Sequence, residues 1–312
     1  MRFVVFGTGG VGGCFGAQLT NAGESVVFVA RGKHLKALRN QGLRFETPEK
    51  DLLIRPIEAT DDPATIGNAD VILICVKACQ VPEAAQAIRT IVGPETLVLP
   101  LQNGVEASSQ LSDVLGSRNV LAGLCGTLSW VAGPGHIKRA GSHNFIKLGE
   151  LDNVRSERVE RLRRVFAAAG ITVEVPANIH KALWEKFMLM TAFGGVGAIT
   201  RAPIGVTRTV PETRRLLKQC MEEVLVLAQA RGIAMSETIV ADSLSFLDTL
   251  PPVGTASLQR DIAAGKPSEL EFWNGAIARL SQQIGLSAPL NKFIYASLLP
   301  QELQARKPQP PL

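Results

Sequence analysis

The chain has 312 residues, 46% of them hydrophobic and 20% charged, with a formal net charge of +5. A single hydrophobic core usually stops growing at about 250–300 residues, so the length predicts two domains of an ordinary soluble protein. The longest apolar stretch, residues 187–199, is interrupted by glycines and is too short to cross a bilayer. We therefore expect no membrane span. Because no signal peptide precedes the first expected strand, we also expect a cytoplasmic location.

The cysteines and the charge pattern exclude three further classes of protein. Five scattered cysteines predict reduced thiols rather than a disulfide framework. Cys75 and Cys79 have no cysteine or histidine partner at the spacing of a zinc site, so we expect no metal. The densest basic run, residues 155–164, alternates with acidic residues as a solvated helix face does, so we expect no nucleic-acid partner. The positive excess instead favours small anionic ligands, and a homodimer stays open as the assembly.

The front half alternates short β-branched or aromatic runs with helix-length segments. This alternation predicts an α/β domain of βαβ units with a doubly wound parallel sheet. The expected core strands are Arg2–Phe6, Ser25–Ala30, Val71–Val76 and Thr96–Pro100. Two hairpins are also expected, over residues 43–57 with a turn near 48–51 and over residues 126–148 with a turn at 133–135.

The back half contains long helical patterns without convincing strands. A helix over residues 154–169 and a strand over 171–175 precede Pro176, where these patterns begin. We therefore expect an α/β domain over residues 1–175 and an all-α domain over residues 176–312. The expected helices cover residues 177–199, 212–231, 237–249, 257–264 and 269–284. Disorder is expected only in the tail, residues 307–312.

A GxGxxG pattern follows the first expected strand directly and opens an apolar helical run, as a dinucleotide-binding loop of the Rossmann type does. Its residues are Gly7, Thr8, Gly9, Gly10, Val11 and Gly12. Gly7 permits the tight turn, Gly9 lets a pyrophosphate approach the backbone, and Gly12 permits close packing of helix and sheet. The alternative is a turn that is merely rich in glycine, and the position after the first strand favours the binding loop.

The second expected strand ends in Arg31, where NAD-binding proteins carry an acidic residue that accepts the ribose hydroxyls. A guanidinium binds a phosphate through two hydrogen bonds, so Arg31 favours the 2′-phosphate of NADP (NADPH). We expect no carboxylate to compete for it. The alternative is a solvated surface arginine.

Several short motifs occur in a characteristic order and spacing. They are GTGGVGG at 7–13, ARG at 30–32, VKA at 76–78, QNG at 102–104, LWEK at 183–186, SLQRD at 257–261 and ELE at 269–271. In this combination the chain resembles the ketopantoate reductase (2-dehydropantoate 2-reductase) family over nearly its whole length. The resemblance implies a Rossmann domain followed by a helical domain like the C-terminal domain of 6-phosphogluconate dehydrogenase. It also implies reduction of a 2-keto acid by NADPH.

The resemblance also implies roles for particular residues. Lys186 would be the catalytic proton donor, since hydride addition leaves an alkoxide that must be protonated. Asn103 would orient the nicotinamide and the substrate, and Lys77 would attract the substrate carboxylate or a cofactor oxygen. Both follow expected parallel strands, at the rim where ligands of such sheets bind. Glu269 would bind a cofactor ribose hydroxyl and Ser257 the substrate carboxylate.

Without the resemblance, each of these residues has an ordinary structural explanation. Lys186 would be a solvated helix lysine, and Asn103 with Gly104 would be only a turn. Glu269 and Ser257 would be polar groups at helix ends.

One departure from the family concerns the substrate. The family usually carries asparagines four and eight residues after the lysine, on the same helix face, whereas this chain has Met190 and Gly194. We still count both positions as substrate-binding. Two polar groups that would bind a substrate hydroxyl are therefore absent, and we expect Gly194, together with Gly195 and Gly197, to leave unusual space. Both changes favour bulkier and less hydroxylated 2-keto acids.

Three functions remain open from the sequence. The first is NADPH-dependent reduction of 2-dehydropantoate to pantoate, in pantothenate biosynthesis, or of a related 2-keto acid. The second is a β-hydroxyacid dehydrogenase-like oxidoreductase, which shares the two-domain plan and a catalytic lysine. The third is a sensor or scaffold that binds NADPH without turnover. None of the four histidines lies in a setting typical of a catalytic histidine acid.

Overall fold

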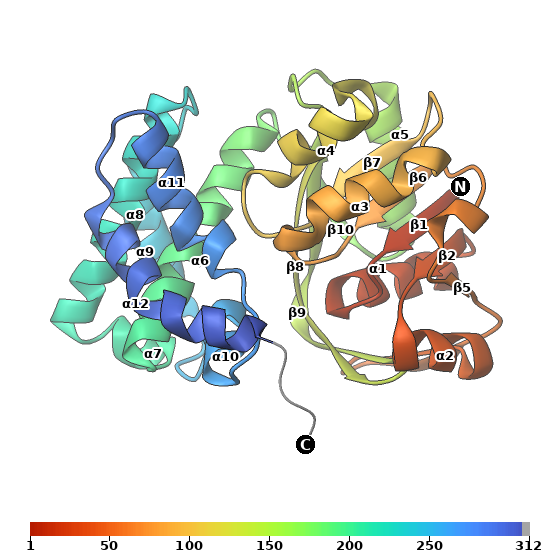
Figure 1. The fold of residues 1–312 in the computed structure, drawn as a ribbon, viewed down its shortest axis with the longest axis horizontal. Coiled ribbons are helices and arrows are strands. Elements are labelled where there is room, and N and C mark those ends of the chain that lie inside the picture. The colour runs from red at the N-terminus through yellow and green to blue at the C-terminus, as the bar shows by residue number, and fades with distance from the viewer. Residues whose placement is uncertain (308–312) are drawn as a thin grey trace. The chain divides into compact units, whose positions relative to one another are not determined.

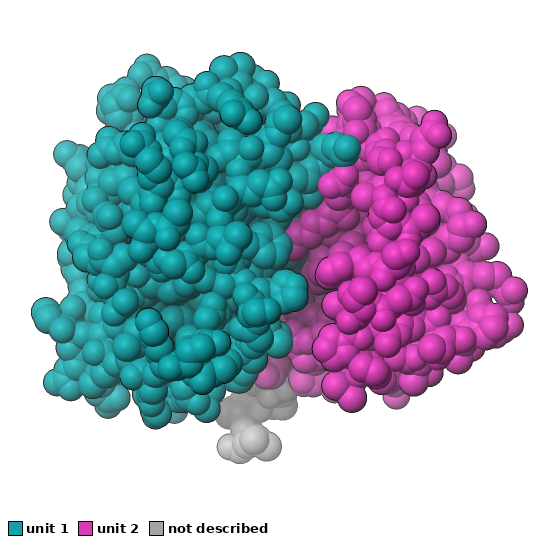
Figure 2. All heavy atoms as spheres, turned by 180° about the vertical axis from the view of Figure 1, so that it is seen from behind, with its two compact units in different colours: residues 1–182 teal, residues 183–312 magenta. Residues whose placement is uncertain are grey.

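The computed structural model describes residues 1–307, so residues 308–312 of the tail expected to be disordered lie outside the described residues. The chain divides into two compact units, Met1–Ala182 and Leu183–Leu312, coloured teal and magenta in Figure 2. The boundary that we expect at Pro176 lies just before helix α6 (Ile179–Thr200), whereas this division falls inside that helix. The two units are described separately.

A parallel sheet of five strands forms the centre of the first unit (Figure 1). The strands are β1 (Arg2–Phe6), β2 (Ser25–Val29), β5 (Glu58–Thr60), β6 (Val71–Ile74) and β7 (Leu97–Pro100). Their order is β5-β2-β1-β6-β7, and every neighbouring pair is parallel. The four expected core strands are confirmed, whereas β5, with three residues, is too short for its pattern to be predicted.

The strands of this sheet are apolar on both faces because each face supports its own core. Along β1, Phe3 and Val5 enter one core while Val4 and Phe6 enter the other, as the two-residue period of a strand requires. Side chains of α1 (Gly10–Asn21) and α5 (Glu157–Ala168) belong to the first core, and those of α3 (Val81–Ile88) and α4 (Ala107–Leu115) to the second. Burying each large apolar side chain contributes about 1.5–3 kcal/mol. The doubly wound arrangement is therefore confirmed.

A second sheet packs on α1. Its strands are β3 (Leu43–Glu46), β4 (Asp51–Ile54), β8 (Ala122–Gly133), β9 (His136–Gly149) and β10 (Thr172–Glu174). Both expected hairpins are confirmed, as β3–β4 and as β8–β9. The longer hairpin crosses α1 so closely that a Cβ at Gly10 would lie 2.3 Å from the Ser129 carbonyl oxygen. This contact fixes the start of α1, where the glycine loop lies.

In its described part, the second unit consists of helices. They are most of α6, then α7 (Ile204–Thr207), α8 (Pro211–Ala230), α9 (Ile239–Thr249), α10 (Ser257–Ala263), α11 (Asn274–Gln283) and α12 (Pro289–Arg306), with a 3₁₀ turn at Leu270–Phe272. The expected helices are confirmed except the one over 269–284, where Trp273 (φ −112°, ψ −98°) separates the 3₁₀ turn from α11. Of the helices described, none is long and apolar enough to span a membrane.

Helix α12 is not predicted from the sequence, and its buried face explains why. The buried positions are Asn291, Ile294, Leu298 and Glu302, which have helical spacing, but only the middle two are apolar. Asn291 Nδ2 donates to the Cys220 carbonyl oxygen (3.2 Å) and to Glu223 (2.7 Å). Glu302 accepts from the Ser268 backbone N–H and from Arg306 (2.7 Å). The buried face of α12 therefore contains polar side chains that form hydrogen bonds inside the protein, and the sequence lacks the continuous apolar stripe that predicts a helix.

Candidate dinucleotide site and substrate residues

The glycine loop joins β1 to α1, and each glycine meets different surroundings. Gly7 has φ +99°, a backbone conformation that residues with a side chain rarely adopt. A Cβ at this position would also lie 2.8 Å from the Val76 side chain. A Cβ at Gly12 would lie 2.2 Å from the Gly7 carbonyl oxygen, so only glycine lets α1 start this close to the loop. A Cβ at Gly9 would meet nothing within 4 Å. The loop is therefore open at Gly9 alone among these three, beside the N-terminus of α1.

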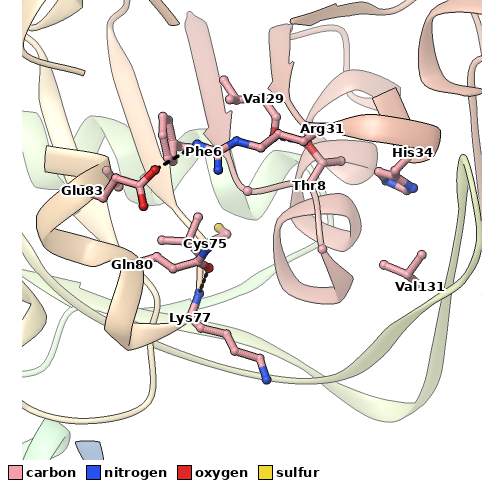
Figure 3. A pocket seen from close by; sticks show the side chains of 15 residues that line it. Phe6, Thr8, Val29, Arg31, His34, Cys75, Lys77, Gln80, Glu83 and Val131 are labelled. Carbon is pink, nitrogen blue, oxygen red and sulfur yellow. Dashed lines mark hydrogen bonds and ion pairs between the residues drawn. The ribbon is translucent and has the colours of Figure 1, made fainter. Parts of the chain in front are cut away.

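The loop borders a cavity of about 400 Å³ at the carboxyl ends of β1, β2 and β6 (Figure 3). It is lined by Phe6, Gly7, Thr8, Gly9, Val29, Ala30, Arg31, His34, Cys75, Val76, Lys77, Gln80, Glu83, Ala84 and Val131. From β1 the chain continues to β2 on one side of the sheet, and it later forms β6 on the other side of β1. The strand order therefore reverses at β1, and open α/β sheets bind ligands at such a switch point. Burial raises the pKa of the Cys75 thiol well above its ordinary value, so this side chain adds no charge to the cavity.

Arg31 follows β2 and points across the cavity to Glu83 in the first turn of α3 (Figure 3). The distance between Arg31 Nη2 and Glu83 Oε1 is 3.1 Å. The expectation that no carboxylate competes for Arg31 is therefore wrong. The sequence misled because Glu83 comes from the helix after β6, 52 residues away, and not from the end of β2.

Two polar residues that follow β6 and β7 are positioned by a buried amide. Gln102 Nε2 donates to the carbonyl oxygens of Ile74 (2.8 Å) and Val76 (2.9 Å), which ties the two strand ends together. This bridge holds the segments that carry Lys77 and Asn103. Lys77 lines the cavity next to Gln80 (Figure 3), whereas Asn103 is half-buried in the turn after β7 and does not line it.

His34, on α2 (Gly32–Gln41), lines the same cavity and fixes the tip of the β8–β9 hairpin. The Gly135 backbone N–H donates to His34 Nδ1 at 3.0 Å. Burial lowers the pKa of the imidazole below its ordinary value, which favours the neutral form that can accept this bond. The hydrogen bond to Gly135 gives His34 a structural role in the wall of the cavity.

The second unit carries the remaining predicted residues. Lys186, Met190 and Gly194 follow one another at four-residue intervals on α6, so they share a helix face. Ser257 is the first residue of α10, and Glu269 precedes the 3₁₀ turn. A Cβ at Gly194 would lie 3.3 Å from the Cβ of Leu258, so α6 and the start of α10 are in contact there.

The glycines of α6 do not leave the space that their sequence predicts. A Cβ at Gly194 would lie 2.6 Å from the ring of Trp273, which is fully buried. Gly195 faces the side chain of Asn274 at 2.7 Å, and Gly197 faces that of Gln259 at 2.6 Å. The expectation of unusual space is therefore wrong, because neighbouring side chains of the same unit fill it.

Sequence reasoning finds part of the cavity and misses part of it. Of the predicted cofactor residues, Gly7, Thr8, Gly9, Arg31 and Lys77 line the cavity, whereas Gly10, Val11 and Gly12 build the start of α1. His34, Gln80 and Glu83 were not predicted. One signal could have found the last two, because the helix turn after a strand end belongs to the same rim as the strand end itself.

The parallel sheet, the open glycine loop and the cavity at the switch point together define a dinucleotide-binding protein of the Rossmann type. Comparison with known proteins gives a more specific class. The family model "Ketopantoate reductase PanE/ApbA" matches residues 3–153, and its C-terminal counterpart matches residues 178–302. The chain belongs to the ketopantoate reductase family, a family of oxidoreductases.

Individual relatives agree with this assignment. The chain is 31% identical to a PanE/ApbA family ketopantoate reductase from Ralstonia eutropha JMP134, with a TM-score of 0.90 and coverage of 98% of this chain and 100% of that one. It is 26% identical to the 2-dehydropantoate 2-reductase of Nostoc sp., over 95% of this chain and 94% of that protein. It is also 26% identical to the uncharacterized oxidoreductase YkpB of Bacillus subtilis, over 96% and 98%.

Proposed function

We propose that the protein reduces a 2-keto acid to the 2-hydroxy acid with NADPH, with 2-dehydropantoate or a related 2-keto acid as substrate. The observation that carries the proposal is the cavity at the glycine loop, with Arg31 in its wall, in a chain of the ketopantoate reductase family. The family supports 2-keto acid reduction. The choice of NADPH is our inference from Arg31, and 2-dehydropantoate is proposed because relatives of the chain are 2-dehydropantoate 2-reductases.

The residues of the first unit suit a dinucleotide. The absence of neighbours around Gly9 leaves room for a pyrophosphate beside the N-terminus of α1, where backbone N–H groups and the helix dipole stabilise anions. Arg31 would hold the 2′-phosphate and Glu269 a ribose hydroxyl. When bound, the nicotinamide supplies a hydride to the ketone carbon.

The remaining polar residues would act on the substrate. We propose that Lys186 protonates the oxygen on which negative charge develops, which is a typical task of a positioned acid. Asn103 would orient the carbonyl group, and Lys77 and Ser257 would bind the carboxylate. Met190 presents an apolar side chain where an asparagine would offer hydrogen bonds, so the grip on a substrate hydroxyl must come from other groups.

The direct test measures nucleotide oxidation with 2-dehydropantoate, other 2-keto acids and β-keto acids, using NADPH and NADH. We expect the highest kcat/KM with a 2-keto acid and NADPH. We also expect NADPH to bind at least tenfold more tightly than NADH, a difference of about 1.4 kcal/mol that Arg31→Ala should abolish. Turnover of β-keto acids alone would favour the β-hydroxyacid dehydrogenase, and binding of NADPH without turnover would favour the sensor. A cytoplasmic location, a role in pantothenate biosynthesis and a homodimer stay predictions.

A further inference from the structure

The carboxylate of Glu83 faces the guanidinium to which we assign the 2′-phosphate. We propose that Glu83 is a specificity-determining residue that weakens binding of the 2′-phosphate and so limits the preference for NADPH over NADH. The inference rests on the proposed function, because it concerns the same cofactor site. It adds a residue that acts against the cofactor that Arg31 favours.

The first argument is distance. Arg31 Nη2 lies 3.1 Å from Glu83 Oε1, so a phosphate that accepts a hydrogen bond from the same guanidinium would lie roughly 6 Å from the carboxylate. A phosphate monoester carries about −1.5 to −2 charges at neutral pH. Repulsion between such a phosphate and one carboxylate at about 6 Å in water is equivalent to roughly tenfold in Kd.

The second argument is that the Arg31–Glu83 pair contributes little to the stability of the fold. The side chains of Arg31 and Glu83 are 69% and 65% exposed. Exposed ion pairs contribute about 0–1 kcal/mol, since solvent screens them and two long side chains must be ordered. Removing the charge of Glu83 is therefore compatible with an intact fold.

The third argument is that Glu83 discriminates between the two nucleotides. A ribose 2′-hydroxyl is neutral, so a nearby carboxylate does not repel it, whereas a 2′-phosphate is a negatively charged acceptor that a carboxylate repels. Arg31 therefore favours NADPH and Glu83 disfavours it, while NADH is affected little by either charge. The observed preference would be the balance of these two residues.

The experiment measures dissociation constants of NADPH and NADH by fluorescence titration for the wild type and for Glu83→Gln. Glutamine keeps the shape of the side chain and removes its charge. We expect the Kd of NADPH to fall about five- to tenfold and the Kd of NADH to change less than twofold. An unchanged ratio of the two constants in Glu83→Gln would overturn the inference.

A matched control is available in the first unit. Glu95 pairs with Arg118 at 2.7 Å, also with exposed side chains, but does not line the cavity. Glu95→Gln changes the net charge by the same amount, so we expect the ratio of the two Kd values to stay at its wild-type value. An equal gain in NADPH affinity in both variants would show a general charge effect and would also overturn the inference.

A second pair of ligands separates this inference from the proposed function. 2′,5′-ADP and 5′-AMP differ in the 2′-phosphate and lack the nicotinamide. If Glu83→Gln tightens 2′,5′-ADP but not 5′-AMP, the role of Glu83 holds even where no keto acid is reduced. If NADPH turnover is found and the binding of both adenosine phosphates is unchanged by the variant, the proposed function holds and the role of Glu83 fails.

Discussion

Two glycine-rich segments, one in each unit, have opposite surroundings. In the loop of the first unit, Gly9 faces nothing within 4 Å, at the edge of a cavity. On α6 of the second unit, Gly194, Gly195 and Gly197 each face a side chain from another segment, at 2.6–2.7 Å from the position of a Cβ. The first segment leaves room for a ligand, and the second makes room for the protein's own core.

The difference shows that the glycine content of a segment does not by itself reveal what occupies the space. An open loop suits a binding site, because a bound ligand can occupy the space that no protein atom fills. A tightly packed helix suits a segment that must hold a reacting side chain in place, because supporting contacts fix its position. The following variants test this contrast, beginning with the proposed proton donor.

Lys186→Ala should have the largest effect. If α6 supplies the proton donor, kcat for the best 2-keto acid should fall by about a hundredfold or more, since the acid acts on charge that develops in the transition state. The Kd of NADPH should stay within about twofold of the wild-type value. Steady-state kinetics and nucleotide titration measure the two effects, and near-normal turnover would remove Lys186 from the mechanism.

Gly194→Ala should destabilise the protein by about 1–3 kcal/mol, because its Cβ would press on the buried ring of Trp273. Urea unfolding measures this loss. Trp273→Phe should relieve the overlap, so the double variant should be more stable than the sum of the single effects predicts. Additive effects would show that Gly194 has space after all. For the same reason, asparagine at position 194 would not restore the family's pattern.

Gly9→Ala should leave the fold nearly unchanged and weaken nucleotide binding. The backbone of Gly9 has φ −81°, which alanine adopts easily, and its Cβ would meet no protein atom. The methyl group would instead occupy the path of the pyrophosphate, so we expect the Kd of NADPH to rise about tenfold. Gly133→Ala, also in open space but outside the cavity lining, is the control. Unaltered binding in Gly9→Ala would place the pyrophosphate elsewhere.

His34→Asn should have the smallest effect, visible only as a change in pH dependence. Burial lowers the pKa of His34 in the folded state, so the unfolded chain binds a proton that the native protein does not. This contribution to the free energy of unfolding is complete at pH values above the ordinary pKa of histidine, near 6.5, and it is lost as the pH falls below that value. Asparagine can still accept the Gly135 bond but does not titrate. The urea midpoint of the variant should therefore fall less between pH 7 and 5 than that of the wild type.

Equal slopes for the wild type and His34→Asn would show that His34 does not contribute to the acid sensitivity of the fold.

Much of the fold is predictable because its elements have local signals. The strands of the first unit are apolar runs between turn residues, and the glycine turn at 133–135 marks the long hairpin. Helix α12 is not predictable in this way. Its buried Asn291 and Glu302 form hydrogen bonds with distant residues, among them Glu223 and Ser268, which lie 68 and 34 residues away in the sequence.

The residues of the candidate site likewise fall into those with a local sequence signal and those without one. The open loop and Arg31 are evident from residues that are close in sequence, since a strand, a turn and a helix start define them. Glu83 and Trp273 are not evident, because their importance depends on the residues that they face across the fold. The sequence shows which groups could act on a ligand, and tertiary contacts decide which groups oppose them or fill their space.

The crossing of α1 by the β8–β9 hairpin has a consequence for synthesis of the chain. Strand β3 pairs in parallel with β9, so that Arg44 is the partner of His136, and the core around α1 includes residues of both strands. Pairings between segments this far apart form slowly, because the intervening chain must first be ordered. As the chain leaves the ribosome, the face of α1 that packs on the second sheet therefore stays uncovered until residues up to Gly149 have been synthesised. Until then, an apolar surface stays accessible to chaperones.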